Sequence, residues 1–144
     1  MKNYAIIALL ACVAFVTLAA TPSHAQILLK ADVPFSFSAG YGMLPAGEYN
    51  ITRSGIGQVV LLSNGRRGVE LMTPKTTDLR DKIGTPKLVF HRYGDEYFLA
   101  EIWTSADDCV RTLSVHARER QLAKMGVSPQ VAVVYAELPS VNGN

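Results

Sequence analysis

Short segments in which apolar and polar residues alternate, separated by turn residues, most constrain the fold of this chain. In Val33–Ser38, valine and two phenylalanines alternate with proline and two serines, and after the turn sequence Pro45–Gly47 the side chains of Tyr49 and Ile51 share one face. Turn signals recur about every eight to twelve residues, a spacing typical of all-β domains. The pattern predicts a single antiparallel β-sandwich or barrel of about seven to nine strands, with one short C-terminal helix.

The first clear hairpin is centred on Asn64-Gly65, a pair favoured in two-residue turns. Such a turn would place Ser63 opposite Arg66 and Val60 opposite Val69. Both faces are then apolar: Val60, Leu62, Val69 and Leu71 lie on one, and Val59, Leu61 and Met72 on the other. A hairpin of this kind is expected to be covered on both sides, or to meet a partner or ligand with one face.

A second hairpin is expected in Leu88–Thr104, with Gly94 and Asp95 at its turn. A three-residue loop that includes Glu96 separates an apolar core face from an outer face rich in aromatic and polar groups, and we prefer this register. A two-residue loop would instead pair His91 with Phe98 and mix the faces. The outer face is the candidate binding surface, because its composition is typical of interfaces; its candidate residues are His91, Tyr93, Tyr97, Glu101 and Trp103.

Between the two hairpins, Pro74–Pro86 shows no alternation and is expected to be a surface loop, with one helical turn near Asp78–Lys82 as an option. The segment Ser114–Gly126 predicts a helix with Ser114 as N-cap and Gly126 just after its end. Its apolar stripe is thin, which favours a solvated surface helix over a helix that binds anionic lipid.

The last strand is expected between Pro129 and Pro139. Its segment from Val131 onward is apolar apart from Glu137. A strand of this composition belongs in the centre of a sheet or pairs with another chain, because exposed at an edge it would promote aggregation.

The N-terminus has the features of a secretory signal peptide. Lys2 precedes the uncharged apolar run Ala5–Ala20, and Ser23-His24-Ala25 fits the small-residue rule for cleavage after Ala25. A membrane anchor and a lipoprotein modified at Cys12 are the alternatives, each less well supported. The expected organisation is therefore a signal peptide over residues 1–25 and one β-rich domain over residues 26–144, exported to the periplasm or beyond, with no later transmembrane segment.

The sequence offers little support for catalysis or for a cofactor. No HExxH, CxxC or GxSxG spacing occurs, so no catalytic residues, metal or cofactor are expected. A hydrolase using His91 and Glu101 is the least favoured reading. Alternatively, the outer face of the hairpin has only a structural role. In that case His91 bonds to Glu101 or to a backbone carbonyl, and the aromatic side chains pack without binding a ligand.

Charge and cysteine content exclude further classes. The formal net charge is +2, of which Lys2 contributes one, so the expected mature chain has no field that would attract nucleic acid. Cys109 would be the sole cysteine after cleavage at Ala25, which rules out an internal disulfide. Asp107 and Asp108 disfavour its thiolate, so a half-buried strand cysteine is expected.

Two long motifs resemble a group of small exported β-rich proteins of soil bacteria. They are DVPFSFSAGYGMLPAGEYNI (Asp32–Ile51) and KLVFHRYGDEYFLAEIWT (Lys87–Thr104), followed by ARERQLA (Ala117–Ala123). The resemblance covers most of the expected mature chain. It implies an exported single β-domain and supplies no active-site residues.

These observations predict a non-catalytic envelope protein that acts by contact with a protein partner, with a second copy of itself as a homo-oligomer, or with a surface polymer. The contact would use the outer face of the Leu88–Thr104 hairpin or an edge strand. The alternative is a β-barrel that carries a small apolar ligand, in which the hairpin Val59–Met72 lines a cavity.

Overall fold

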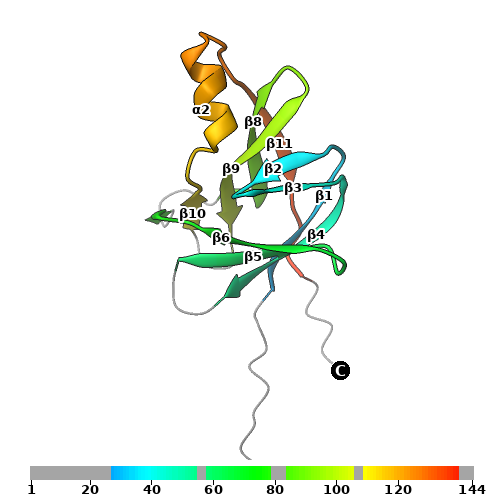
Figure 1. Cartoon of the computed structure of the whole chain (residues 1–144). Helices are drawn as coiled ribbons and strands as arrows, with labels where there is room; N and C mark the ends of the chain where they lie inside the picture. Colours follow the sequence, from blue (N-terminus) through cyan, green and yellow to red (C-terminus); the bar gives the residue numbers. More distant parts are fainter. Residues whose placement is uncertain (1–26, 55–57, 79–83, 106–108, 140–144) are drawn as a thin grey trace, which may run out of the picture.

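The computed structural model describes residues 27–54, 58–78, 84–105 and 109–139 (Figure 1). The predicted signal peptide lies outside these residues, as does most of the helical turn considered near Asp78–Lys82.

The described strands form two sheets that pack as a sandwich, which confirms the all-β prediction and decides for a sandwich over a closed barrel (Figure 1). The first sheet is antiparallel with the order β1-β4-β5-β6. Its strands are β1 (Ile27–Val33), β4 (Gly47–Ser54), β5 (Val59–Ser63) and β6 (Gly68–Met72).

The second sheet has the order β11-β8-β9-β10-β7. Its strands are β11 (Gln130–Tyr135), β8 (Lys87–Tyr93), β9 (Glu96–Thr104), β10 (Cys109–Thr112) and β7 (Lys75–Asp78). The small hairpin of β2 (Phe37–Ala39) and β3 (Gly42–Leu44) joins this sheet through a parallel bridge between Ser38 and Phe98. The helix α2 (Ala117–Lys124) lies at the same end of the molecule as the β8–β9 turn (Figure 1).

Two segments contain strands that the sequence did not predict. Pro34 divides the expected first strand, so β1 belongs to one sheet and β2 to the other. β1 lies at a sheet edge. The prediction of a loop over Pro74–Pro86 was wrong for Lys75–Asp78, which pairs with β10 as β7.

The core is built from the inward faces of both sheets. Fully buried members include Val33, Tyr49, Ile51, Val60, Leu62, Leu71, Leu88, Phe90 and Ile102. Phe37 joins the two layers, because its ring packs edge-on against Tyr49 on β4 and against Phe90 on β8. The alternation predicted for Tyr49 and Ile51 is confirmed.

The β5–β6 hairpin has the predicted faces but a longer loop. Ser63 pairs with Gly68 rather than with Arg66, and Leu62 pairs with Val69. The Asn64 side-chain oxygen accepts hydrogen bonds from the backbone N–H groups of Arg66 and Arg67, which closes a four-residue loop. Because the predicted register was wrong by two residues, and the side-chain period of a strand is also two, each residue keeps its face.

The β8–β9 hairpin has the two-residue loop that we did not prefer. Tyr93 pairs with Glu96, and His91 with Phe98. The register then shifts between Phe90–Leu99 and Val89–Glu101, so that Ala100 is an extra residue in β9. This β-bulge lets both ends of the hairpin keep an apolar face toward the core despite the short loop.

Tyr49 also fixes the turn that precedes β4. Its hydroxyl donates a 2.6 Å hydrogen bond to the carbonyl of Pro45, and its side chain is fully buried. We expect Tyr49→Phe to lower the free energy of unfolding by about 1 kcal/mol, because the ring still fills the core but the hydrogen bond is lost. Urea unfolding monitored by circular dichroism measures this, with Tyr41→Phe as the control because Tyr41 is fully exposed. Equal stability of both variants and the wild type would contradict the assigned role of this bond.

Candidate functional site

The structure brings four of the five candidate binding residues to the outer face of the β8–β9 hairpin. His91 and Tyr93 lie toward its turn, and Glu101 and Trp103 toward its other end. Tyr97 lies on the opposite face, where its ring stacks on Phe35 at 3.8 Å and packs against the core. The expectation that Tyr97 shares the outer face was therefore wrong, because it followed from the three-residue loop.

The helix α2 covers the half of this face that lies nearest the turn. Leu122 on the helix packs with Tyr93 and Phe98, and all three are buried. Glu119 is also buried, and its carboxylate lies 2.5 Å from Nδ1 of His91. The helix is therefore solvated on one side only, and His91 has Glu119 as its partner rather than Glu101 or a backbone carbonyl, the two partners considered from the sequence.

Tyr93 completes this buried polar cluster. Burial raises the pKa of its phenol, and the neighbouring Glu119 carboxylate raises that pKa further. Sequence reasoning missed Glu119, although its place three residues before Leu122 puts both side chains on one side of a helix.

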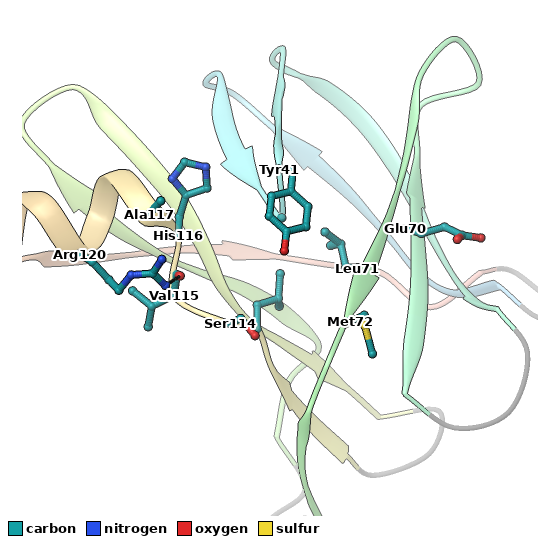
Figure 2. A pocket seen from close by; sticks show the side chains of 11 residues that line it. Tyr41, Glu70, Leu71, Met72, Ser114, Val115, His116, Ala117 and Arg120 are labelled. Carbon is teal, nitrogen blue, oxygen red and sulfur yellow. Dashed lines mark hydrogen bonds between the residues drawn. The ribbon is translucent and has the colours of Figure 1, made fainter.

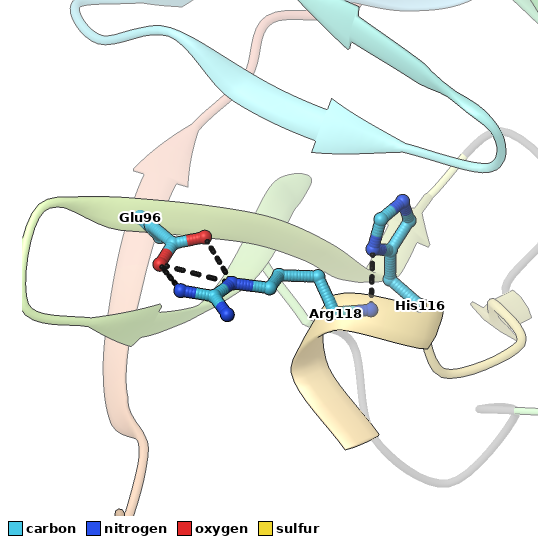
Figure 3. Close-up of polar contacts among 3 residues, drawn as sticks. All are labelled: Glu96, His116 and Arg118. Carbon is cyan, nitrogen blue, oxygen red and sulfur yellow. Dashed lines mark hydrogen bonds and ion pairs between the residues drawn. The ribbon is translucent and has the colours of Figure 1, made fainter. Parts of the chain in front are cut away.

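The helix begins two residues later than predicted. His116 is the N-cap, and its ring nitrogen Nδ1 accepts a 3.2 Å hydrogen bond from the backbone N–H of Arg118 (Figure 3). The predicted N-cap, Ser114, is exposed in the connection before the helix. Gly126 follows the helix with a positive φ of 80°, as expected for the position after its end.

An ion pair fastens the helix to the turn of the hairpin. The Arg118 guanidinium binds both carboxylate oxygens of Glu96, at 2.9 and 3.1 Å (Figure 3). Hydrogen bonding from Arg118 holds the pKa of the Glu96 carboxyl below its ordinary value. Because both side chains are about half exposed, the pair positions the helix more than it stabilises the fold.

The other half of the outer face stays partly accessible. Trp103 donates a 2.8 Å hydrogen bond from its indole nitrogen to Glu101, and the ammonium of Lys87 lies 3.9 Å from the centre of the indole ring. The polar groups of Glu101 and Trp103 are therefore already hydrogen-bonded to each other within β9.

A groove of about 270 Å³ lies between the start of α2 and β6 (Figure 2). Its walls are largely apolar, and its lining also includes Arg120, His116 and Glu70. The apolar wall includes Leu71 and Met72 from the β5–β6 hairpin and Val115 before the helix. Sequence reasoning did not identify this groove, because it forms between segments far apart in the chain.

The most exposed row of apolar side chains in a strand lies on β11. Val131, Val133 and Tyr135 are 67%, 42% and 70% exposed, whereas Ala132 and Val134 pack against the core. β11 pairs with β8 on one side, and within the part of the chain that the structure describes no strand pairs with Val131–Tyr135 on its other side, although β1 lies close to the Tyr135 end. Of the two placements considered from the sequence, the central one was wrong, and pairing with another chain stays a prediction.

Two further observations concern metal binding, membrane spans and the cysteine of β10. Among the described residues, no three His, Cys, Asp or Glu side chains group so as to hold a metal ion, and no helix is long and apolar enough to span a membrane. Cys109 is half-buried in β10, as expected.

Comparison of the chain with protein-family models, curated proteins and solved structures finds no match.

The pair His91–Glu119 predicts a specific stability pattern. We expect His91→Leu to lower the free energy of unfolding by about 1–3 kcal/mol, because it removes the histidine partner of the buried Glu119 carboxylate. The double variant His91→Leu/Glu119→Leu should recover most of that loss, because neither member of the pair is then left buried without the other. Chemical denaturation of the wild type, both single variants and the double variant measures the coupling. A double variant no more stable than His91→Leu would show that the pair is not coupled.

Proposed function

We propose that this protein is an exported, non-catalytic β-sandwich module that acts by contact with a protein partner along the open edge of β11. The observation that carries this proposal is the exposed apolar row of Val131, Val133 and Tyr135 on a strand with an unpaired side. Strand addition to such an edge is a recurring mode of protein recognition, in which the backbone supplies hydrogen bonds and the side chains supply specificity.

The local polar contacts support a non-catalytic role. A hydrolase on the outer face of β8–β9 would use His91 together with Glu101 across an accessible site. Instead, His91 bonds to a carboxylate buried under α2, and Glu101 accepts a hydrogen bond from Trp103. Both groups therefore have partners that fit a structural role.

The export part of the proposal rests on the N-terminal sequence. The charged start, the apolar run and the Ser23-His24-Ala25 site favour a cleaved signal peptide.

A second candidate function is the binding of a small apolar ligand in the groove beside α2. The observation that favours it is that Leu71 and Met72 of the β5–β6 hairpin form part of the apolar wall. This departs from the barrel carrier considered from the sequence, because the site would lie at the open side of a sandwich.

Site-specific photo-crosslinking in the cell tests the proposed contact. We expect a photoreactive phenylalanine analogue in place of Val131 to give a defined crosslinked protein product, because this side chain would lie against the partner strand. The matched control is the same substitution at Met43, which is 73% exposed on β3 in the other half of the chain. A ligand function predicts products from Met72 at the groove instead.

Crosslinks from Met43 as readily as from Val131, or none from Val131, would contradict the proposal. The intact mass of the purified product also reports where the chain begins, and a start at Gln26 is the expected result.

A further inference from the structure

The groove beside α2 gathers exposed apolar side chains from three segments that lie far apart in the sequence. Tyr41 is in the turn between β2 and β3, Met72 ends β6 and Val115 precedes the helix; all three line the groove and are exposed. The lining also includes Leu71 and Leu113, which are buried. An exposed apolar surface bordered by polar residues is typical of a ligand-binding groove.

The β2–β3 turn comes close to β6 because it contains a glycine. Gly40 has a positive φ of 58°, and a Cβ at this position would lie 3.0 Å from Cδ2 of Leu71. A larger residue would therefore push the turn away from β6. The close approach holds Tyr41, the next residue, beside the groove, and Figure 2 shows its ring directed toward the space between Leu71 and Ser114.

Two basic residues from the start of α2 also line the groove. His116 and Arg120 are four positions apart and therefore lie near one side of the helix (Figure 2). The Arg120 guanidinium donates a 2.8 Å hydrogen bond to the carbonyl of Val115, which uses one of its five N–H groups. Whereas Arg118 is paired with Glu96, no carboxylate among the described residues pairs with Arg120.

The capping bond of His116 determines which of its ring nitrogens can donate. Nδ1 accepts the hydrogen bond from the backbone N–H of Arg118, so the proton of the neutral ring is on Nε2. The ring packs against Phe98, with the two ring centres 5.4 Å apart, which fixes its place at the start of the helix. His116 therefore adds an Nε2–H donor to the N–H groups of Arg120.

The acidic residue of the lining does not cancel these donors. Of the described residues that line the groove, Glu70 alone is acidic. Its carboxylate accepts a 3.5 Å hydrogen bond from the hydroxyl of Ser54 on β4. Figure 2 shows this carboxylate pointing away from His116 and Arg120, on the far side of β6. The helix side of the groove is therefore complementary to a negative charge.

We propose that the groove binds one small amphipathic carboxylate, with its anionic head at Arg120 and His116 and its aliphatic chain beside Leu71, Val115 and Tyr41. A carboxylate matches the guanidinium because both groups are planar and can form two parallel hydrogen bonds. The apolar walls match the chain because contact with them removes its surface from water. The inference rests on the second candidate function, the ligand groove, and does not depend on the contact at β11.

The size of the groove limits the ligand to a short or medium chain. The volume is about 270 Å³. Since water takes up about 30 Å³ per molecule in the liquid, the groove has the volume of about nine water molecules. That is the size of an ion such as octanoate, and it is too small for a phospholipid.

Isothermal titration calorimetry of the protein, purified as the cell processes it, tests the inference at pH 7, where an aliphatic carboxylate is ionised. Octanoate should bind saturably, with one ion per chain. Octanol, which has the same chain without the charge, should bind at least about tenfold more weakly, because it lacks the charge-assisted hydrogen bonds. Octylammonium should bind no better than octanol, because its charge has the wrong sign.

Two variants and a matched control assign the head and the chain to their residues. Arg120→Gln should weaken octanoate binding at least about tenfold and leave octanol binding unchanged. Lys124→Gln removes the same charge from an exposed position on the same helix, outside the groove, and should bind octanoate like the wild type. Val115→Asp should weaken both ligands, and it serves as the second test if circular dichroism shows that Arg120→Gln does not fold.

The outcomes separate this inference from the functions proposed above. Octanol bound as tightly as octanoate, or octanoate binding weakened equally by Arg120→Gln and Lys124→Gln, would overturn the anionic head and leave an apolar ligand groove. Binding of neither ligand would overturn the groove as well. Binding to anionic phospholipid vesicles without binding of dissolved octanoate would assign the basic side of α2 to a membrane surface and also overturn the inference. None of these results changes the crosslink expected from Val131.

Discussion

The two sheets depend on one aromatic contact that reaches across the core. Phe37 packs edge-on against Tyr49 and Phe90, with ring centres 5.4 and 5.2 Å away. Its position follows from Pro34, which ends β1 in one sheet and lets the next residues enter the other. Phe35 extends the cluster to Tyr97. The hairpin β8–β9 is thereby held against the first sheet, with its other face left for α2 and its neighbour β11 left at the edge of the fold.

The sequence predicts which face a strand residue occupies better than it predicts loop length. The alternation of Tyr49 and Ile51 and the faces of Val60 and Leu71 follow from the two-residue period of a strand. The loops at Asn64 and Gly94 were each predicted with the wrong length. In the first case an Asn side chain closes a longer turn, and in the second a bulge at Ala100 corrects the register. Both corrections arise from local geometry that residue type alone does not determine.

The candidate site shows the same limit at the level of tertiary contacts. Sequence reasoning grouped His91, Tyr93, Glu101 and Trp103 correctly on one face, but it could not show that α2 covers part of that face. The helix has a thin apolar stripe, and its hold on the sheet comes from Leu122, from the buried Glu119 and from the ion pair of Arg118 with Glu96. Polar contacts between segments far apart in sequence leave no periodic signal. The most exposed apolar side chains in a strand are therefore those of β11, and not those of the outer face of the β8–β9 hairpin.

The central claim is that the open edge of β11 is paired in the working protein, and residue-resolved amide hydrogen exchange tests it most directly. The strand contains its own control, because the N–H groups of Ala132 and Val134 face β8 and those of Val131 and Val133 face the open edge. We predict that Ala132 and Val134 are protected in the isolated protein, and that the bound partner protein selectively adds protection to Val131 and Val133. Fast exchange of Val131 and Val133 in the complex with the partner protein, beside protected Ala132 and Val134, would contradict the account.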